Sequence, residues 1–229
     1  MFRYRIAFRK EGPARWIGHL DLMRALERAF RRAELPLCYS EGFNPRPRFV
    51  FALPLPVGTV GLRELADFYL RVPANPEGVK ARLATVLPEG LSILAVKRIP
   101  RDAPNLMAAV GMASYRAEGE LTHAVTAGQV AEAVDAVLAA KEIKCTRNGK
   151  GGAKEKDIRP GIFGLQASVT EKILTINMRV RAGQQGNIRP AEVVDAFLRL
   201  GGLPGSPRNF VYYHTGLFMV TDGRAASLG

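Results

Sequence analysis

Apolar and polar side chains alternate at the start of the chain. Apolar residues occupy every second position from Phe2 to Phe8, and the positions between them hold Arg3, Arg5 and Ala7. A period of two is the pattern of a β-strand with one buried face. We therefore predict a strand over residues 2–8 with a basic outer face. Residues 18–35 then repeat apolar side chains at helical spacing, which predicts a helix.

Further patterns of the same kind complete a small domain. Strands are predicted over residues 48–53, 65–72 and 91–99, and a helix over residues 76–87, where Pro76 stands near the start. The order β-α-β-β-α-β is that of the split-βαβ, or ferredoxin-like, fold, in which two helices cover one face of an antiparallel sheet.

The same order recurs in the second half of the chain. The segments that predict it are strands over residues 114–121, 143–148, 172–181 and 209–220 and helices over residues 127–140 and 189–200. We therefore predict an α+β protein with two tandem ferredoxin-like domains. Domain one covers residues 1–100, a connector covers 101–112, domain two covers 113–222, and residues 223–229 form a flexible tail.

Charge changes this picture by pointing to a class of partner. The chain has 33 Lys and Arg against 21 Asp and Glu, a formal net charge of +12. Such an excess attracts polyanions, so nucleic acid is the first partner to consider. Cys38 and Cys145 are far apart and belong to no Cys-x-x-Cys pair, so we expect no zinc or iron–sulfur cofactor in this chain. We also expect no membrane segment and a cytoplasmic location, because no apolar run reaches transmembrane length.

The first predicted helix carries a basic stripe. Arg24, Arg28 and Arg31 stand at positions i, i+4 and i+7, opposite the apolar side. Three guanidinium groups on one helix face can straddle a phosphate backbone. The alternative is a solvated face stabilised by pairs of Asp21 with Arg24 and of Glu27 with Arg31.

The segment "CYSEGFNPRPRF", residues 38–49, is a second candidate for RNA binding. Its candidate contact residues are Tyr39, Phe43, Asn44, Arg46 and Arg48. Aromatic platforms, an amide for a base edge and guanidinium groups for phosphate are the mixture that recognises single-stranded RNA. The alternative is a proline-stiffened crossover whose aromatic residues close the top of the core.

A Gly- and Lys-rich segment, residues 148–165, is the third candidate. Its basic residues are Lys150, Lys154, Lys156 and Arg159. The spacing of a P-loop is missing, so nucleotide hydrolysis is not expected, whereas a mobile loop that grips phosphate is. A disordered insertion is the alternative.

His19 is the one candidate for catalysis. It stands at the start of the first predicted helix, where the helix dipole favours a neutral imidazole that could take a proton from a ribose 2′-hydroxyl. The alternative is a capping or packing residue. A helix of this length, rising about 1.5 Å per residue, would hold His19 roughly 20 Å from residues 38–49 unless that loop folds back. His123 and His214 form no ligand cluster at the level of sequence, and the common catalytic motifs are missing, so we do not expect this chain to be an enzyme by itself.

Three motifs carry a family resemblance: "GHLDL" at residues 18–22, "GFNP" at residues 42–45 and the later "KDIRPGIFGL". With them the chain resembles the radical SAM-linked family, whose domain occurs alone or fused behind a radical S-adenosylmethionine protein. His commonly stands in that family where this chain has Arg46. The resemblance implies a radical SAM partner and an accessory role in modifying RNA or a translation component.

A second resemblance is architectural. Tandem ferredoxin-like domains and a His at the start of the first helix are similar to CRISPR repeat-processing endonucleases, which cut RNA without a metal. Only His19 matches residue by residue. The sequence therefore leaves three hypotheses: an RNA-binding accessory protein of a radical SAM enzyme, a metal-independent RNA endonuclease that uses His19, and a protein–protein scaffold for the radical SAM partner.

Overall fold

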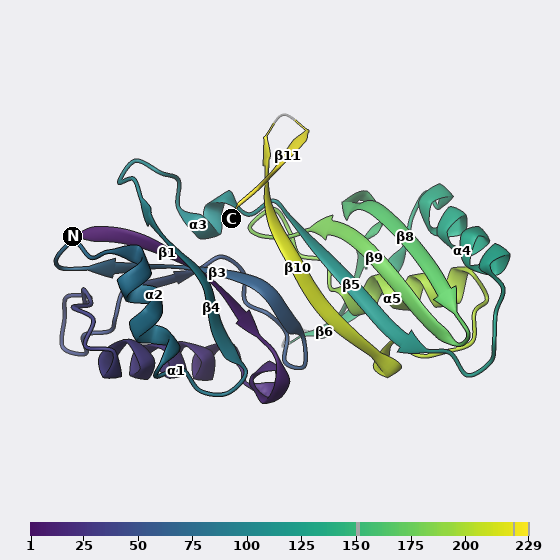
Figure 1. Ribbon diagram of the computed structural model, residues 1–229. Coiled ribbons are helices and arrows are strands. Elements are labelled where there is room, and N and C mark those ends of the chain that lie inside the picture. Colours follow the sequence, from purple (N-terminus) through teal and green to yellow (C-terminus); the bar gives the residue numbers. More distant parts are fainter. Residues whose placement is uncertain (150–151, 222, 229) are drawn as a thin grey trace. The chain divides into compact units, whose positions relative to one another are not determined.

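The computed structural model describes residues 1–149, 152–221 and 223–228, and it divides the chain into two compact units (Figure 1). Unit 1 consists of Met1–Gly111 together with His214–Gly229, and unit 2 consists of Met112–Tyr213. Strands in both units pair antiparallel wherever their register is defined, and helices pack on them. The predicted α+β class is thus confirmed. No helix in the described part of the chain combines the length and the apolar character needed to cross a bilayer.

Unit 1 begins with alternating strands and helices. In chain order these are β1 (Phe2–Lys10), the 3₁₀ helix η1 (Gly12–Trp16), α1 (His19–Arg32), β2 (Phe49–Phe51), β3 (Val60–Leu70), α2 (Pro76–Ala84) and β4 (Leu91–Ile99). The strand order is β4-β1-β3, with β2 paired to β3. These segments lie where the apolar periodicity predicts them, except that β2 is shorter and β3 begins earlier.

One face of this sheet packs against α1 and α2. Tyr4, Ile6 and Phe8 of β1 are almost fully buried there, and Phe30 of α1 lies edge-on to Phe68 of β3 with ring centroids 4.8 Å apart. The period of two along β1 therefore produces the buried face that the sequence predicts.

The other face of β1 is not exposed, contrary to the prediction of a basic outer face. Arg3 is 8% exposed and Arg5 is 15% exposed, because residues of the connector and of the C-terminal segment cover them. The connector contains α3 (Leu106–Ala109), whose Leu106 is fully buried. Figure 1 shows α3 on the side of the sheet away from α1. Residues 101–111 therefore belong to unit 1 as part of its core.

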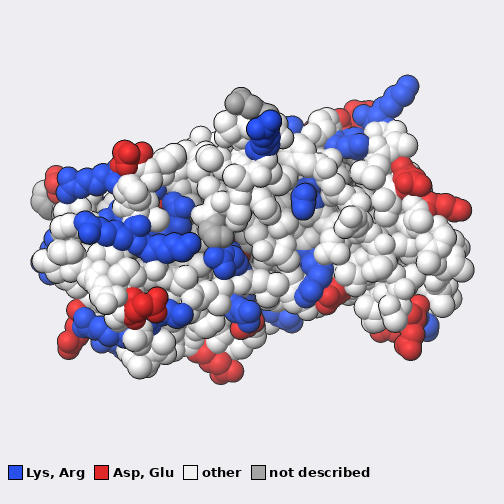
Figure 2. All heavy atoms as spheres, turned by 45° about the horizontal axis from the view of Figure 1, so that its top comes forward, with Lys and Arg blue, Asp and Glu red and all other residues white. Residues whose placement is uncertain are grey.

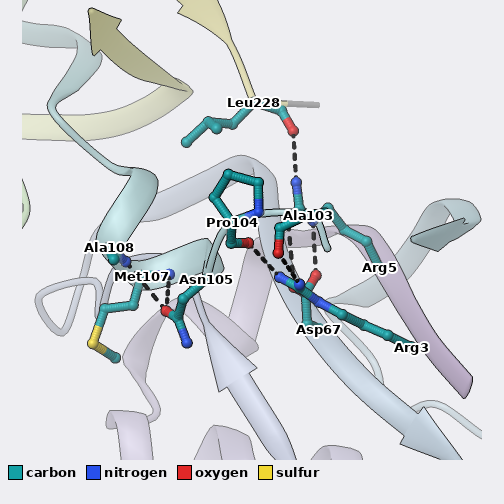
Figure 3. Close-up of polar contacts among 9 residues, drawn as sticks. All are labelled: Arg3, Arg5, Asp67, Ala103, Pro104, Asn105, Met107, Ala108 and Leu228. Atoms are coloured by element: carbon teal, nitrogen blue, oxygen red, sulfur yellow. Dashed lines mark hydrogen bonds and ion pairs between the residues drawn. The ribbon is translucent and has the colours of Figure 1, made fainter. Parts of the chain in front are cut away.

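A buried carboxylate holds this cover in place (Figure 3). Asp67 of β3 is inaccessible to solvent, and its Oδ2 accepts hydrogen bonds from Arg3 Nε at 2.9 Å and Nη2 at 2.6 Å. Its Oδ1 accepts one from Arg5 Nε at 2.7 Å. Arg5 Nη2 also donates to Asp67 Oδ2, at 3.2 Å. Other donors reach backbone oxygens: Arg3 bonds the carbonyls of Ala103 and Pro104, each at 2.7 Å, and Arg5 bonds that of Leu228 at 3.2 Å.

The C-terminal segment is also ordered into strands. β10 (Phe210–Thr221) begins in unit 2, and its part from His214 onward belongs to unit 1. β11 (Arg224–Ser227) pairs antiparallel with β10, so that Phe218 faces Ser227. The segment predicted to be a flexible tail is therefore a paired strand over residues 224–227.

Unit 2 repeats the alternation of strands and helices. Its main elements are β5 (Met112–Glu120), α4 (Ala127–Ala139), β8 (Ile162–Thr170), β9 (Ile173–Arg181), α5 (Pro190–Leu200), the 3₁₀ helix η3 (Pro207–Asn209) and the start of β10. The strand order is β10-β5-β9-β8, and α4 contacts both α5 and β8. Thr126 and Gln129 form a capping box that fixes the start of α4.

The second strand of unit 2 was predicted in the wrong place. Residues 143–148 were predicted to join the main sheet, but β6 (Lys144–Gly149) pairs with β7 (Gly152–Asp157) in a separate two-stranded hairpin. The 3₁₀ helix η2 (Arg159–Gly161) follows, and the main sheet instead contains β8. A register shift between Ile162 and Gly164 interrupts the alternation of β8, which explains why the sequence pattern hides this strand.

Replacing the Asp67 carboxylate by an amide should destabilise the protein strongly. Asp67→Asn leaves the buried Arg3 without its counter-charge, and breaking a buried pair in this way costs about 3–5 kcal/mol. Urea unfolding followed by circular dichroism measures the loss. The control is Asp21→Asn, whose partner Arg24 is 67% exposed, and it should change the free energy of unfolding by less than about 1 kcal/mol. Equal effects of the two substitutions would show that the buried network is not what holds the cover.

Candidate nucleic-acid interface

The loop at residues 38–48 projects from unit 1 and is held at its base. Cys38 N–H donates to the carbonyl of Tyr69 at 2.8 Å, and Arg48 N–H donates to that of Cys38 at 2.9 Å. Ser40 N–H donates to the Arg46 carbonyl at 2.8 Å, which closes the arms of the loop. Residues 41–46 at the tip are all exposed. The loop therefore has a fixed base and an accessible tip.

The aromatic residues of the segment 38–49 divide between solvent and core. Phe43 is fully exposed and Tyr39 is 43% exposed. Phe49, the last residue of the segment, packs on the core, with its ring centroid 5.1 Å from that of Phe30. The alternative in which these rings close the top of the core therefore holds for Phe49 and not for Phe43. Tyr39, Phe43, Asn44, Arg46 and Arg48 are all accessible to a ligand, and their role in RNA binding stays a prediction.

Two adjoining hollows lie beside the base of the loop, where β1 begins and β4 ends. The first has a volume of about 510 Å³ and is lined by Met1, Phe2, Arg3, Arg98, Ile99, Pro100 and Arg101. The second has a volume of about 410 Å³ and is lined by Met1, Arg3, Tyr69 and Arg101. The hollows share three of these residues, and we call the two together the Met1 groove. Each falls in the size range of small-ligand pockets.

Guanidinium groups surround the Met1 groove. Arg98 places its Cζ 5.0 Å from the centre of the Phe2 ring, Arg101 Nη2 donates to the Met1 carbonyl at 3.3 Å, and Arg48 Nη1 lies 3.6 Å from Met1 Sδ. Among the residues that the structure describes, none of these three arginines forms an ion pair with a carboxylate. Figure 2 shows Lys and Arg side chains gathered over unit 1 on this side of the molecule. The groove is therefore open, partly apolar and positively charged.

The basic stripe of α1 is partly neutralised within the helix. Arg24 pairs with Asp21 at 3.2 Å, and Arg31 pairs with Glu27 at 3.1 Å. These are the two ion pairs expected if the stripe is a solvated helix face rather than a phosphate-binding one. Arg28 is exposed. The stripe lies on an accessible face, and phosphate binding by it stays a prediction.

The third predicted site is a hairpin rather than an irregular loop where the structure describes it. Lys154 and Lys156 belong to β7; Lys154 is exposed, and Lys156 Nζ donates to the Asn187 carbonyl at 3.5 Å. Lys150 lies outside the described residues. The disordered alternative therefore does not hold for residues 152–157.

Arg159 has structural contacts that the sequence did not suggest. Its Nη2 donates to the Leu138 carbonyl at 2.6 Å and its Nη1 to the Ile162 carbonyl at 3.2 Å, which join η2 to the end of α4. The β6–β7 hairpin also contains Arg147, which is not among the predicted site residues. Arg147 forms a bidentate pair with Glu192, with both distances 2.6 Å.

His19 is the first residue of α1 and is half-buried beside β2. Its ring is edge-on to Phe51 with centroids 5.0 Å apart, and it lines a cavity of about 10 Å³ together with Lys10 and Glu64, which we call the polar cluster. Burial lowers the pKa of His19 below its ordinary value. Burial also lowers the pKa of Lys10, and the nearby Glu64 carboxylate partly offsets that shift. A cavity of this size holds about one water molecule.

His214 pairs with Glu64 of this cluster, a contact that the sequence does not predict. Its Nδ1 lies 2.5 Å from Glu64 Oε1, and both side chains are buried. The two residues are 150 positions apart, so only the folded chain could reveal the pair. Lys10 Nζ in turn donates to the Arg15 carbonyl at 3.1 Å. The cluster thus supplies its own charge partners.

His19 lies close to the strand that follows the projecting loop. Its ring centroid is 5.0 Å from that of Phe51, which is two residues after Phe49, the last residue of the predicted segment. The separation of roughly 20 Å expected from the length of the helix therefore does not hold for the end of that segment. The Met1 groove lies at Arg3, and Lys10 lies seven residues further along β1, which is roughly 23 Å in an extended strand.

Comparison with known proteins identifies the family of this chain. Residues 3–190 match the sequence profile of a family described as "Uncharacterized protein conserved in bacteria (DUF2344)". No curated protein matches the chain.

Three solved structures are similar in part. A chain in the crystal structure of a Cbf5-Nop10-Gar1 complex aligns at 9% identity and a TM-score of 0.50, over 93% of this chain and 48% of that one. This chain therefore spans about half the length of that relative, and the likeness concerns the fold alone. An unknown protein from Galdieria sulphuraria aligns at 14% identity and a TM-score of 0.27, over 93% and 98% of the two chains. A putative glycine cleavage system transcriptional repressor aligns at 14% identity and a TM-score of 0.23, over 93% of this chain and 98% of that one.

Acidification should destabilise the protein through His19. Because folding lowers the pKa of His19 from 6.5, the unfolded chain binds more protons in the range just below that value, so stability falls as the pH drops through it. The difference in urea unfolding free energy between about pH 7.5 and about pH 5.5 should therefore be smaller in His19→Gln than in the parent.

The exposed His123 provides the matched control, because His123→Gln shows the general effect of removing one histidine from the chain. An NMR titration of the His19 ring tests the shift directly. A midpoint at or above 6.5 would contradict the burial argument.

Proposed function

This chain belongs to the bacterial family DUF2344, and from its basic groove we propose that it is an RNA-binding accessory protein that holds RNA for a radical SAM enzyme. The observation that supports RNA binding is the Met1 groove. Arg98 and Arg101 line it, Arg48 contacts Met1 beside it, and none of the three has a carboxylate partner among the described residues. Unneutralised guanidinium groups attract phosphate, and release of counterions from RNA drives the binding.

The projecting loop supports the same proposal. Its base lies beside the groove, through Cys38 bonded to Tyr69 and Arg48 beside Met1. Its tip presents Phe43 to solvent. A large exposed aromatic ring costs free energy in water and stacks well on a nucleobase. Loop and groove together form a basic and aromatic surface of the kind that single-stranded RNA requires.

The tandem ferredoxin-like fold is part of the proposal. Each unit has the order β-α-β-β-α-β when the β6–β7 hairpin is set aside as an insertion in unit 2. The corresponding strand orders are β4-β1-β3-β2 and β10-β5-β9-β8. In both, the first and third strands are central and the second and fourth lie outside, which supports two copies of one fold.

The radical SAM partner rests on the sequence resemblance alone. The motifs "GHLDL" and "GFNP" carry it. In the part of the chain that the structure describes, no group of three His, Cys, Asp or Glu side chains is placed to hold a metal ion. The proposal therefore assigns the iron–sulfur cluster and the S-adenosylmethionine to the partner. A scaffold that binds the partner without RNA is the alternative, and binding that survives nuclease treatment would identify it.

The endonuclease alternative has weaker support. Burial lowers the pKa of His19, which favours the neutral imidazole that a general base needs, but only this residue matches the endonucleases, and it lines a cavity of about 10 Å³ rather than the Met1 groove. Incubation of total RNA with the protein in EDTA tests this alternative. New ends with a 2′,3′-cyclic phosphate that disappear in His19→Ala would establish it.

Removing the groove arginines should weaken RNA binding and its dependence on salt. The triple variant Arg48→Ala, Arg98→Ala, Arg101→Ala loses three phosphate contacts, so the slope of log K against log salt should become about 2 units less steep. Affinity should fall at least tenfold at ordinary salt. Fluorescence anisotropy with labelled RNA, over a series of salt concentrations, measures both.

A charge-matched control separates the groove from net charge. Lys141, Lys172 and Arg208 are exposed residues of unit 2, and their triple replacement by Ala removes the same formal charge. This control should bind RNA nearly as the parent does. Equal losses in the two triple variants would mean that net charge, rather than the Met1 groove, determines binding.

A further inference from the structure

The Met1 groove has two adjoining compartments that share Met1, Arg3 and Arg101. Their volumes are about 510 Å³ and about 410 Å³. Met1 contacts two guanidinium groups, since Arg101 Nη2 bonds its carbonyl and Arg48 Nη1 contacts its Sδ. Met1 is about half exposed, so a ligand in either compartment can reach it.

The first compartment has a cationic and aromatic lining. The Arg98 Cζ lies over the Phe2 ring, 5.0 Å from its centre, and both residues line the compartment. Arg98 is exposed. A planar guanidinium can stack on a base with its other face and can bond phosphate through its edge.

The second compartment has an aromatic wall. Tyr69 and Arg101 line it. Arg3 lines it as well, but four of its five N–H groups already bond Asp67 and the carbonyls of Ala103 and Pro104. Arg3 is therefore a rigid support, and Tyr69 and Arg101 are left to contact a ligand.

From this arrangement we infer that the Met1 groove binds two consecutive nucleotides of single-stranded RNA, one base in each compartment and the Met1 side chain between them. The inference rests on the proposed function and narrows it to unpaired RNA. One base stacks on Arg98 and the next on Tyr69, while Arg48 and Arg101 contact the backbone. A duplex cannot use these hollows, because its bases are stacked inside the helix and its deep major groove excludes side chains.

The test compares three labelled ligands of equal length: a single-stranded RNA, the same RNA annealed into a duplex, and a strand that lacks bases. At one salt concentration the parent should bind the single strand at least tenfold more tightly than the other two. Stacking of a base on an aromatic ring is worth about 1–3 kcal/mol, so losing one platform should cost roughly five- to hundredfold in affinity.

Two substitutions remove a platform at constant charge. Tyr69→Leu and Arg98→Lys should each weaken binding of the single strand by that factor, with the salt dependence and the binding of the base-free strand unchanged. Tyr69→Phe keeps the ring and should bind as the parent does. Urea unfolding of each variant establishes that it is folded.

Different results would overturn the two-nucleotide site and the proposed function. Equal binding of single strand and duplex, with the triple arginine variant still weakened, would overturn the two-nucleotide site and leave RNA binding in place. An equal loss of base-free and normal strands in Tyr69→Leu would overturn base stacking there. Parent protein that binds none of the three ligands would overturn the proposed function as well.

Discussion

The architecture of unit 1 depends on the ion pairs of the Asp67 carboxylate with Arg3 and Arg5. Asp67 is fully buried, and a buried carboxylate is tolerable only when it is paired and hydrogen-bonded. Arg3 and Arg5 provide that pairing and bring one more positive charge than Asp67 cancels. Backbone carbonyls satisfy the guanidinium donors that remain. Those carbonyls belong to the connector and to the C-terminal segment, so a single carboxylate fixes two segments that are distant in sequence.

This network also shapes the groove. Arg3 bonds the Ala103 and Pro104 carbonyls, and Pro100 and Arg101 directly before them line the hollows beside Met1. If the connector moved freely, Arg101 would have no fixed position relative to Arg98. Holding the ligand-contacting groups in place before binding reduces the ordering cost that binding would otherwise incur. The buried charge network therefore supports the open, charged surface next to it.

Sequence pattern predicts what is periodic and misses what depends on contact between distant segments. The β1 and α1 segments were predicted because their apolar spacing is regular, whereas β8 was hidden by a register shift near Gly164. Among the predicted RNA-binding residues that the structure describes, Arg48 contacts Met1 of the Met1 groove. Arg98 and Arg101 were missed because they come from the end of a strand and from a segment that looked like a linker. Pairing of β1 with β4 brings that strand end close to Phe2.

The two ends of β1 differ in how their positive charges are compensated and in how open they are to solvent. At the Lys10 end, Lys10 lies near the Glu64 carboxylate and Glu64 contacts His214, all within the protein core. That cluster is compensated internally and has room for about one water molecule. At the Arg3 end, Arg98 and Arg101 extend to solvent beside hollows of several hundred Å³ and have no acidic partner among the described residues. Under the proposed function, bound phosphate would supply a counter-charge at the Arg3 end, where the guanidinium groups are open to solvent.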